Sequence, residues 1–160
     1  GCTDAKEVDV QAACESAMMS LLVAMSGANY IHDAAGLMEA DLTVSYEKLV
    51  IDNEILGMCQ RVLRGIEVTD ESLALELMLK KAPGEDFLGE MHTVEHMRSE
   101  FFMPSLANRD RREGYDPQDN ALARASAFVE KIRREPPDSC LSEDVSRRIL
   151  ERFPEILLKD

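Results

Sequence analysis

The sequence predicts an α/β fold in its first part and a mostly helical remainder. Two strand-like segments, residues 1–6 and 28–32, alternate with two long helices. This alternation is typical of a parallel sheet or a β/α barrel, in which each helix connects one strand to the next. After residue 68 the pattern indicates helices and loops. We therefore expect two parts, residues 1–68 and a helical extension over residues 69–160.

The first helix is expected to run from Asp9 to Met25. An aspartate oxygen accepts hydrogen bonds from the free N–H groups of a first turn, so Asp9 is suited to begin it. Gly27 suits the position after its end, where a left-handed backbone is common. Its methionines, like most in this chain, are expected to pack in the core. Its apolar stripe, at helical spacing, consists of Val10, Cys14, Ala17, Met18, Leu21, Leu22 and Met25.

The segment after Gly27 is expected to be a short buried strand, residues 28–32, that ends in a polar cluster. Strand side chains alternate between two faces, so Tyr30 and His32 would share one face, away from the following helix. In a β/α barrel, side chains where a strand ends lie at the open face that carries reactive groups. The opposite face of the strand would carry Asn29, Ile31 and Asp33.

A connecting loop over Gly36–Leu42 leads to a second long helix, which begins after Ser45 and stops at Gly65. Its acid-rich stretch, Asp52-Asn53-Glu54, is expected to form a solvated or salt-bridged face. Four more helices are predicted: one capped by Thr69 that ends before Ala82, one over about Thr93–Phe102, one from Asp116-Pro117 to Arg134 that is stopped by Pro136-Pro137, and one capped by Ser142.

The balance of charge argues against two classes of partner. The 160 residues include 31 acidic and 18 basic side chains, a formal net charge of −13. Nucleic acid and anionic membrane surfaces repel such a chain. The basic clusters at Arg109–Arg112 and Lys131–Arg134 are interrupted or flanked by acids, so we expect solvated faces there.

Cysteine usage and hydropathy indicate a cytoplasmic protein. No stretch approaches the roughly 20 apolar residues that span a bilayer, and no signal peptide is visible. Two strand-like segments do not close a barrel, and the chain begins at Gly1 without an initiator methionine, so we expect the C-terminal part of a longer protein. The cysteines form no C-x-x-C pair and are expected to be reduced; they are Cys2, Cys14, Cys59 and Cys140.

The segment His92-Thr93-Val94-Glu95-His96 fits the H-x-x-E-H pattern of one group of zinc peptidases. Histidines four residues apart share a helix face and could bind zinc. A catalytic zinc also needs a third ligand, for which the sequence offers no cue, so we expect no metal here. The motif leaves a zinc-dependent peptidase as one alternative function. The polar, acidic tail leaves a non-catalytic helical interaction module as another.

Seven short motifs follow one another over about residues 1–112. They are Thr3-Asp4-Ala5-Lys6, Asp9-x-Gln11-Ala12, Gly27-Ala28-Asn29-x-Ile31-His32, Ser45-x-Glu47-x-x-Val50-x-Asp52-x-Glu54, Arg64-Gly65-Ile66-x-Val68, Pro83-Gly84-x-x-Phe87-Leu88 and His92-Thr93-x-x-His96-x-Arg98-x-Glu100. In order and spacing they resemble the trimethylamine methyltransferase family of corrinoid-dependent enzymes. The likeness departs at Ala82-Pro83-Gly84-Glu85, where a Gly-Pro-Gly-Gly turn is expected, and fades after residue 115.

The resemblance implies a fold, an activity and a partner. Family members are (β/α)8 TIM barrels that move a methyl group from a methylated amine to cobalt(I) of a corrinoid carried by a separate protein. Residues 1–65 would supply the last two β/α units, with the remaining helices wrapped around the barrel. The substrate would be trimethylamine or a quaternary amine of the betaine type, and the fragment by itself would be inactive and bind no cofactor. A homo-oligomer is possible, and a pyrrolysine, present in some members, would lie upstream.

The resemblance also directs attention to five residues. His32 is expected to be catalytic, orienting a methylamine or binding the carboxylate of a betaine. The ring of Tyr30 can attract a methylammonium cation. Asn29, Asp4 and Lys6 are expected to contribute to the substrate site, with a plain Asp4–Lys6 ion pair at the barrel rim as the alternative for the last two.

Overall fold

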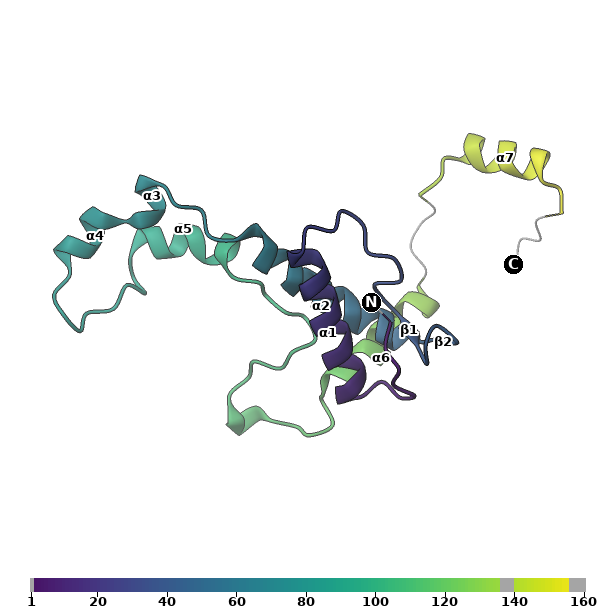
Figure 1. The fold of residues 1–160 in the computed structure, drawn as a ribbon, viewed down its shortest axis with the longest axis horizontal. Helices are drawn as coiled ribbons and strands as arrows, with labels where there is room; N and C mark the ends of the chain where they lie inside the picture. The colour runs from purple at the N-terminus through teal and green to yellow at the C-terminus, as the bar shows by residue number, and fades with distance from the viewer. Residues whose placement is uncertain (1, 136–139, 156–160) are drawn as a thin grey trace. The chain divides into compact units, whose positions relative to one another are not determined.

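The computed structural model describes residues 2–135 and 140–155, and helices predominate in it (Figure 1). The chain divides into two compact units, residues 1–129 and 130–160. The elements are α1 (Val10–Met25), β1 (Leu37–Met38), β2 (Thr43–Val44), α2 (Tyr46–Arg64), α3 (Asp70–Leu73), α4 (Leu75–Lys80), α5 (Met91–Glu100), a 3₁₀ turn at Arg112–Gly114, α6 (Ala121–Arg134) and α7 (Glu143–Arg152). The predicted helix-rich chain is confirmed.

The two long helices begin and end where their capping residues predict. The Asp9 carboxylate accepts from the N–H of Ala12 at 3.0 Å, and the Ser45 hydroxyl accepts from the N–H of Lys48 at 3.1 Å. Gly27 and Gly65 follow the helix ends with φ of +89° and +69°, a region that glycine enters without steric cost. These local signals therefore fix α1 and α2.

The predicted strand at residues 28–32 is wrong. These residues form an irregular, largely exposed loop, and the described part of the chain places no strand beside them. A strand of a parallel sheet requires neighbours on which to pair its N–H and C=O groups. Among the described residues no such neighbour pairs with the backbone of residues 28–32.

The sheet lies in the segment predicted as a connecting loop. β1 and β2 form an antiparallel hairpin in which Leu37 faces Val44 and Met38 faces Thr43. Three successive turn residues, Glu39, Ala40 and Asp41, have φ between 52° and 70°. Among the described residues this hairpin is the whole sheet, so the expected parallel arrangement is absent from them.

The strand-like N-terminal segment lies against this hairpin. Thr3 donates its N–H to the carbonyl of Leu37 at 3.4 Å and accepts from the N–H of Ala40 at 3.4 Å. The carbonyl of Ala5 accepts from the N–H of Glu39 at 3.3 Å. Thr3 and Ala5 are both 1% exposed, so the segment is buried although it forms no regular strand.

Helix α1 packs on α2 through its smallest side chains (Figure 1). Ala12, Ser16 and Ser20, spaced four residues apart, are at most 1% exposed. The buried residues of α2 are Lys48, Asp52, Glu54, Ile55 and Cys59. The expectation for the methionines is wrong: Met38 is buried, but eight others are 40% exposed or more, namely Met18, Met19, Met25, Met58, Met78, Met91, Met97 and Met103.

A carboxylate on α2 organises a distant loop. Glu54 accepts hydrogen bonds from the N–H groups of Ser105, Leu106 and Ala107 at 2.5, 2.7 and 3.2 Å, and from the Ser105 hydroxyl at 2.9 Å. Burial raises the pKa of Glu54, but these hydrogen bonds outweigh it and the net pKa is lowered. The charged form of Glu54 therefore stabilises the loop.

The end of α2 is joined to the end of α5. Arg61 donates to the carbonyl and to the carboxylate of Glu100, both at 2.6 Å, and Arg64 also pairs with this carboxylate at 3.1 Å. The ring of Phe102 lies on Gly57 of α2, where an added Cβ would come within 2.6 Å of a ring carbon. Only glycine leaves room for the ring in this position.

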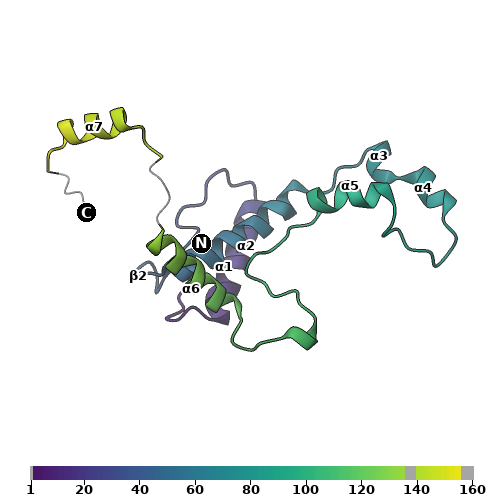
Figure 2. The ribbon, with the colours of Figure 1, turned by 180° about the vertical axis from the view of Figure 1, so that it is seen from behind.

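The remaining helices follow their predictions less closely. The helix expected after Thr69 is divided at Ala74, whose φ of 46° separates α3 from α4. Helix α5 begins at Met91 instead of Thr93, and α3, α4 and α5 lie side by side in both views (Figure 1 and Figure 2). α6 begins after Asn120, whose side chain accepts from the N–H of Ala123, so the start predicted at Pro117 is wrong.

In the second unit, Ser142 caps α7 as predicted, accepting from the N–H of Val145. Pro136 and Pro137, predicted to stop α6, lie outside the described residues. None of the helices in the described ranges has the length and hydropathy required to cross a membrane.

We expect Glu54→Gln to lower the free energy of unfolding at pH 7 by about 1–3 kcal/mol, because a neutral amide cannot accept all four hydrogen bonds. A lowered pKa means that the stabilisation is present above the unfolded-state pKa, about 4.3, and is lost as the pH falls through the folded-state pKa. Urea unfolding at a series of pH values would measure this. The difference from the parent chain should shrink towards acid pH, and Glu76→Gln, on the exposed surface of α4, serves as control. A difference independent of pH would contradict the assignment.

We expect Gly57→Ala to destabilise the chain by about 1–3 kcal/mol, because the new methyl group must displace the Phe102 ring. In a Phe102→Ala background the same substitution should be neutral or stabilising by up to about 1 kcal/mol, since alanine is the better helix former. Thermal unfolding of the four chains of this cycle measures the coupling. Equal effects of Gly57→Ala in both backgrounds would show that the two residues do not compete for space.

Candidate functional site

The loop between α1 and β1 carries three of the five residues expected in the site. It runs between two glycines, Gly27 and Gly36, with φ of +89° and +82°. Tyr30 is 78% exposed and the side chain of His32 is 73% exposed. Their ring centroids lie 6.2 Å apart with the planes tilted by 53°. The loop thus presents an aromatic ring and an imidazole side by side to solvent.

His32 has a partner that the strand interpretation placed on the opposite face. Its Nδ1 is paired with the carboxylate of Asp33. Asp33 has a φ of 52°, in the left-handed region, which turns the side chain towards its neighbour. Strict strand alternation would have separated the two, so the sequence analysis missed Asp33 as a member of the group.

Asp4 and Lys6 do not form the plain ion pair that was the alternative expectation for them. Lys6 donates its ammonium group to the backbone carbonyl of Asp4 at 2.6 Å, and no Asp4–Lys6 ion pair forms. The Asp4 N–H and the Thr3 hydroxyl both donate to Glu15 of α1, at 3.0 and 2.5 Å. The Thr3 hydroxyl, the Gln11 amide and the Asp4 N–H all lower the pKa of Glu15. Glu15 therefore fixes the backbone from which the exposed Asp4 side chain projects.

The structure brings four of the five expected residues together as two pairs. Tyr30 and His32 are in ring contact, and Asp4 and Lys6 share a hydrogen bond. Within residues 2–135 and 140–155, no hydrogen bond, ion pair or ring contact joins one pair to the other or involves the side chain of Asn29. The backbones meet instead where Thr3 and Ala5 bond to residues 37–40.

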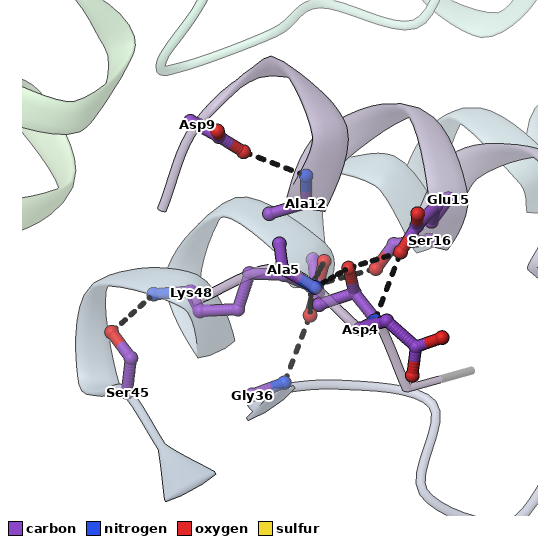
Figure 3. A network of polar contacts seen from close by, with 11 residues as sticks. Asp4, Ala5, Asp9, Ala12, Glu15, Ser16, Gly36, Ser45 and Lys48 are labelled. Atoms are coloured by element: carbon purple, nitrogen blue, oxygen red, sulfur yellow. Dashed lines mark hydrogen bonds and ion pairs between the residues drawn. The ribbon is translucent and has the colours of Figure 1, made fainter. Parts of the chain in front are cut away.

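A buried polar network joins α1, α2 and Gly36 at the end of the loop (Figure 3). The ammonium group of Lys48 lies 2.5 and 2.6 Å from the carboxylate oxygens of Asp52 and 2.6 Å from the hydroxyl of Ser16. Asp52 also accepts from the N–H of Gly36 at 2.8 Å. Lys48 and Asp52 are 0% and 1% exposed, so the predicted salt-bridged face exists, but it is buried and not solvated.

The H-x-x-E-H motif begins α5. The imidazole centroids of His92 and His96 lie 4.3 Å apart, with the ring planes tilted by 44°. Nε2 of His92 lies 3.0 Å from the backbone carbonyl of Glu71, and Nε2 of His96 lies 3.7 Å from the side-chain carboxylate of Glu71. Glu95 is exposed. No group of three His, Cys, Asp or Glu side chains suited to hold a metal occurs among the described residues. The pair packs α5 against α3.

Comparison with known proteins identifies the group to which the chain is related. Residues 1–153 match the family described as trimethylamine methyltransferase (MTTB). The chain belongs to the trimethylamine methyltransferase family. The match continues well past residue 115, where the motif likeness fades, so the charged C-terminal helices are part of the family pattern.

Individual relatives carry methyltransferase names. The chain is 33% identical over 142 residues to trimethylamine methyltransferase MttB of Desulfitobacterium hafniense, which is 85% of this chain and 28% of that protein. It is 34% identical over 109 residues to a glycine betaine methyltransferase of the same species, covering 68% and 23%. It is 45% identical over 91 residues to MttB of Methanosarcina barkeri, covering 57% and 18%. The chain thus spans about a quarter of the length of these relatives or less.

Membership of this family does not favour the zinc peptidase or the non-catalytic module. Both the matched family and the named relatives are methyltransferases. The two histidines of the H-x-x-E-H motif have packing partners on α3 that account for their arrangement.

We expect His92 and His96 to bind no stoichiometric zinc, because the motif offers two ligands and a structural zinc usually takes four. Metal analysis of the purified chain after dialysis against zinc would measure this, with His96→Ala as the matched comparison. About one zinc per chain that is lost in His96→Ala would overturn the packing role assigned to the pair.

Proposed function

We propose that this chain contributes to an enzyme that moves a methyl group from trimethylamine, or from a quaternary amine of the betaine type, to the cobalt of a corrinoid protein. The observation that carries the proposal is the family match over residues 1–153. The names of the relatives supply the two substrate classes. The cobalt supplies the nucleophile, and the residues of this chain would bind and orient the amine.

We propose further that residues 1–65 supply the last two β/α units of a (β/α)8 barrel. Helix α1 is apolar almost throughout, and such helices are buried in larger structures. The relatives are roughly three times as long as this chain, so a family-length protein has the material to cover α1. The apolar residues of α1 that the rest of such a protein would cover include Val10, Met18, Leu22 and Met25, each more than half exposed.

The exposed ring pair fits a methylated ammonium ion. A cation over the face of Tyr30 gains about 0.5–2 kcal/mol, and the carboxylate of Asp33 adds negative charge nearby. His32, held by Asp33, could orient the amine or donate a hydrogen bond to the carboxylate of a betaine. Asn29, Asp4 and Lys6 would complete the polar surround, with Asp4 favouring the cation.

Exposure of Tyr30 and His32 also fits a cofactor that arrives on another protein. The cobalt must reach the methyl group from outside this chain, so the substrate site has to be open on one side. In this proposal the corrinoid belongs to the partner and no described residue is assigned to hold it. The four cysteines are free thiols, which supports a reducing compartment such as the cytoplasm.

In an intact family-length enzyme that carries these residues, we expect His32→Ala to lower the rate of cobalt methylation more than about tenfold, because a lost positioning contact costs at least about 1.4 kcal/mol of transition-state stabilisation. The melting temperature should stay close to that of the parent, since the side chain is exposed. Absorbance of the corrinoid measures the rate, and thermal unfolding measures the stability.

Tyr115→Ala, which removes another exposed aromatic ring outside the loop, serves as the control and should leave the rate unchanged. An unchanged rate together with a lower melting temperature for His32→Ala would assign His32 a structural role and refute its place in the site.

A further inference from the structure

The Lys48–Asp52 pair has an unusual position for two opposite charges. Both side chains are at most 1% exposed, and both lie on α2 one turn apart. Removing two charges from water is costly, and a well-packed apolar pair would serve stability as well or better. Stability alone therefore does not explain why an ion pair occupies this position.

The geometry shows what the pair is connected to. One carboxylate oxygen of Asp52 contacts only the ammonium group of Lys48. The other contacts both this ammonium group and the N–H of Gly36. Lys48 in turn contacts the hydroxyl of Ser16 on α1. Gly36 is the last residue of the loop that carries Tyr30 and His32, and it is buried with a φ of +82°. The network thus links α1, α2 and the end of the loop (Figure 3).

Gly36 is held from both sides. Its N–H donates to Asp52, and its carbonyl accepts from the N–H of Ser45, the N-cap of α2, at 3.0 Å. An added Cβ on Gly36 would lie 3.3 Å from the Cβ of Leu49, so the loop end is pressed directly on α2. By contrast, residues 26–30 are all exposed. The loop therefore has a fixed end at Gly36, four residues from His32.

We propose that Asp52 is a positioning residue for the candidate methylamine site, acting through the N–H of Gly36, and that Lys48 and Ser16 hold its carboxylate in place. This inference rests on the proposed function of the loop. Asp52 matters as the acceptor for the N–H of Gly36, which it meets at 2.8 Å. Lys48 matters because its ammonium group contacts both oxygens of that carboxylate and so orients it inside the protein.

Two double variants of the intact enzyme separate anchoring from stability. Lys48→Met/Asp52→Asn removes both charges but keeps an oxygen that can accept from Gly36. Lys48→Met/Asp52→Leu removes the charges and the acceptor. Replacing a buried pair by neutral groups is often neutral for stability, so both should melt close to the parent. Lys48→Met/Asp52→Ala, which lacks the acceptor and adds no volume, makes the same test if the leucine variant fails to fold.

Two measurements are made on each variant. Hydrogen–deuterium exchange of peptides covering residues 27–36 reports loop anchoring without reference to activity. The KM for trimethylamine in cobalt methylation reports positioning of the site. For the leucine variant we expect exchange of the loop and the KM to rise about tenfold, the effect of losing one hydrogen bond to a charged group. For the asparagine variant we expect both to stay within about threefold of the parent, because its amide oxygen still accepts.

Each outcome decides the inference. Loop exchange that is unchanged in the leucine variant would overturn it, whatever the activity. Faster exchange with an unchanged KM would overturn the positioning role as well. If loop exchange and KM rise equally in the asparagine and leucine variants, the charge of Asp52 matters and its oxygen as acceptor for Gly36 does not. That result would also overturn the inference. A parent enzyme without methyl transfer would refute the proposed function, and the exchange data would then still decide whether Asp52 anchors the loop.

Discussion

The buried ion pair between Lys48 and Asp52 connects the segments at the centre of the first unit, which are α1, α2 and the end of the loop before β1. It occupies the space that the small side chains of α1 leave against α2, and it satisfies a backbone N–H at the point where an irregular loop returns to the helices. Breaking such a pair on one side leaves an uncompensated charge at a cost of about 3–5 kcal/mol. The close approach of α1 and α2 and the path of the loop are therefore determined together.

Three carboxylates in this chain fix segments of irregular backbone by accepting their hydrogen bonds, a role that strand pairing has in a sheet. Asp52 holds Gly36, Glu15 holds Thr3 and Asp4, and Glu54 holds the loop that begins at Ser105. In each case the oxygens accept from backbone or hydroxyl groups of a segment without regular structure. Part of the large negative charge of the chain is thus structural, because hydrogen bonds lower the pKa of Glu15 and of Glu54 and so stabilise their charged forms in the fold.

Sequence reasoning succeeded where the determinants are local and failed where they are distant. The caps Asp9, Ser45 and Ser142 act within three residues, so the starts of their helices could be predicted. A strand at residues 28–32 depends on neighbours far along a chain, and the contact of Glu54 with Ser105 spans 51 residues. The sequence placed Tyr30 and His32 together only through the alternation of a strand that does not form, and it missed Asp33, whose left-handed backbone breaks that alternation.

Because Cys59 is buried in α2, the reactivity of its thiol reports whether the helical core is closed or open. Burial raises the pKa of this thiol, and the thiolate is the form that reacts with alkylating reagents. Cys14 and Cys140 are exposed, so they are modified first, while Cys59 reacts at the rate at which its helix becomes accessible. The kinetics of labelling at one sulfur atom can therefore follow opening of the helical core without any added probe.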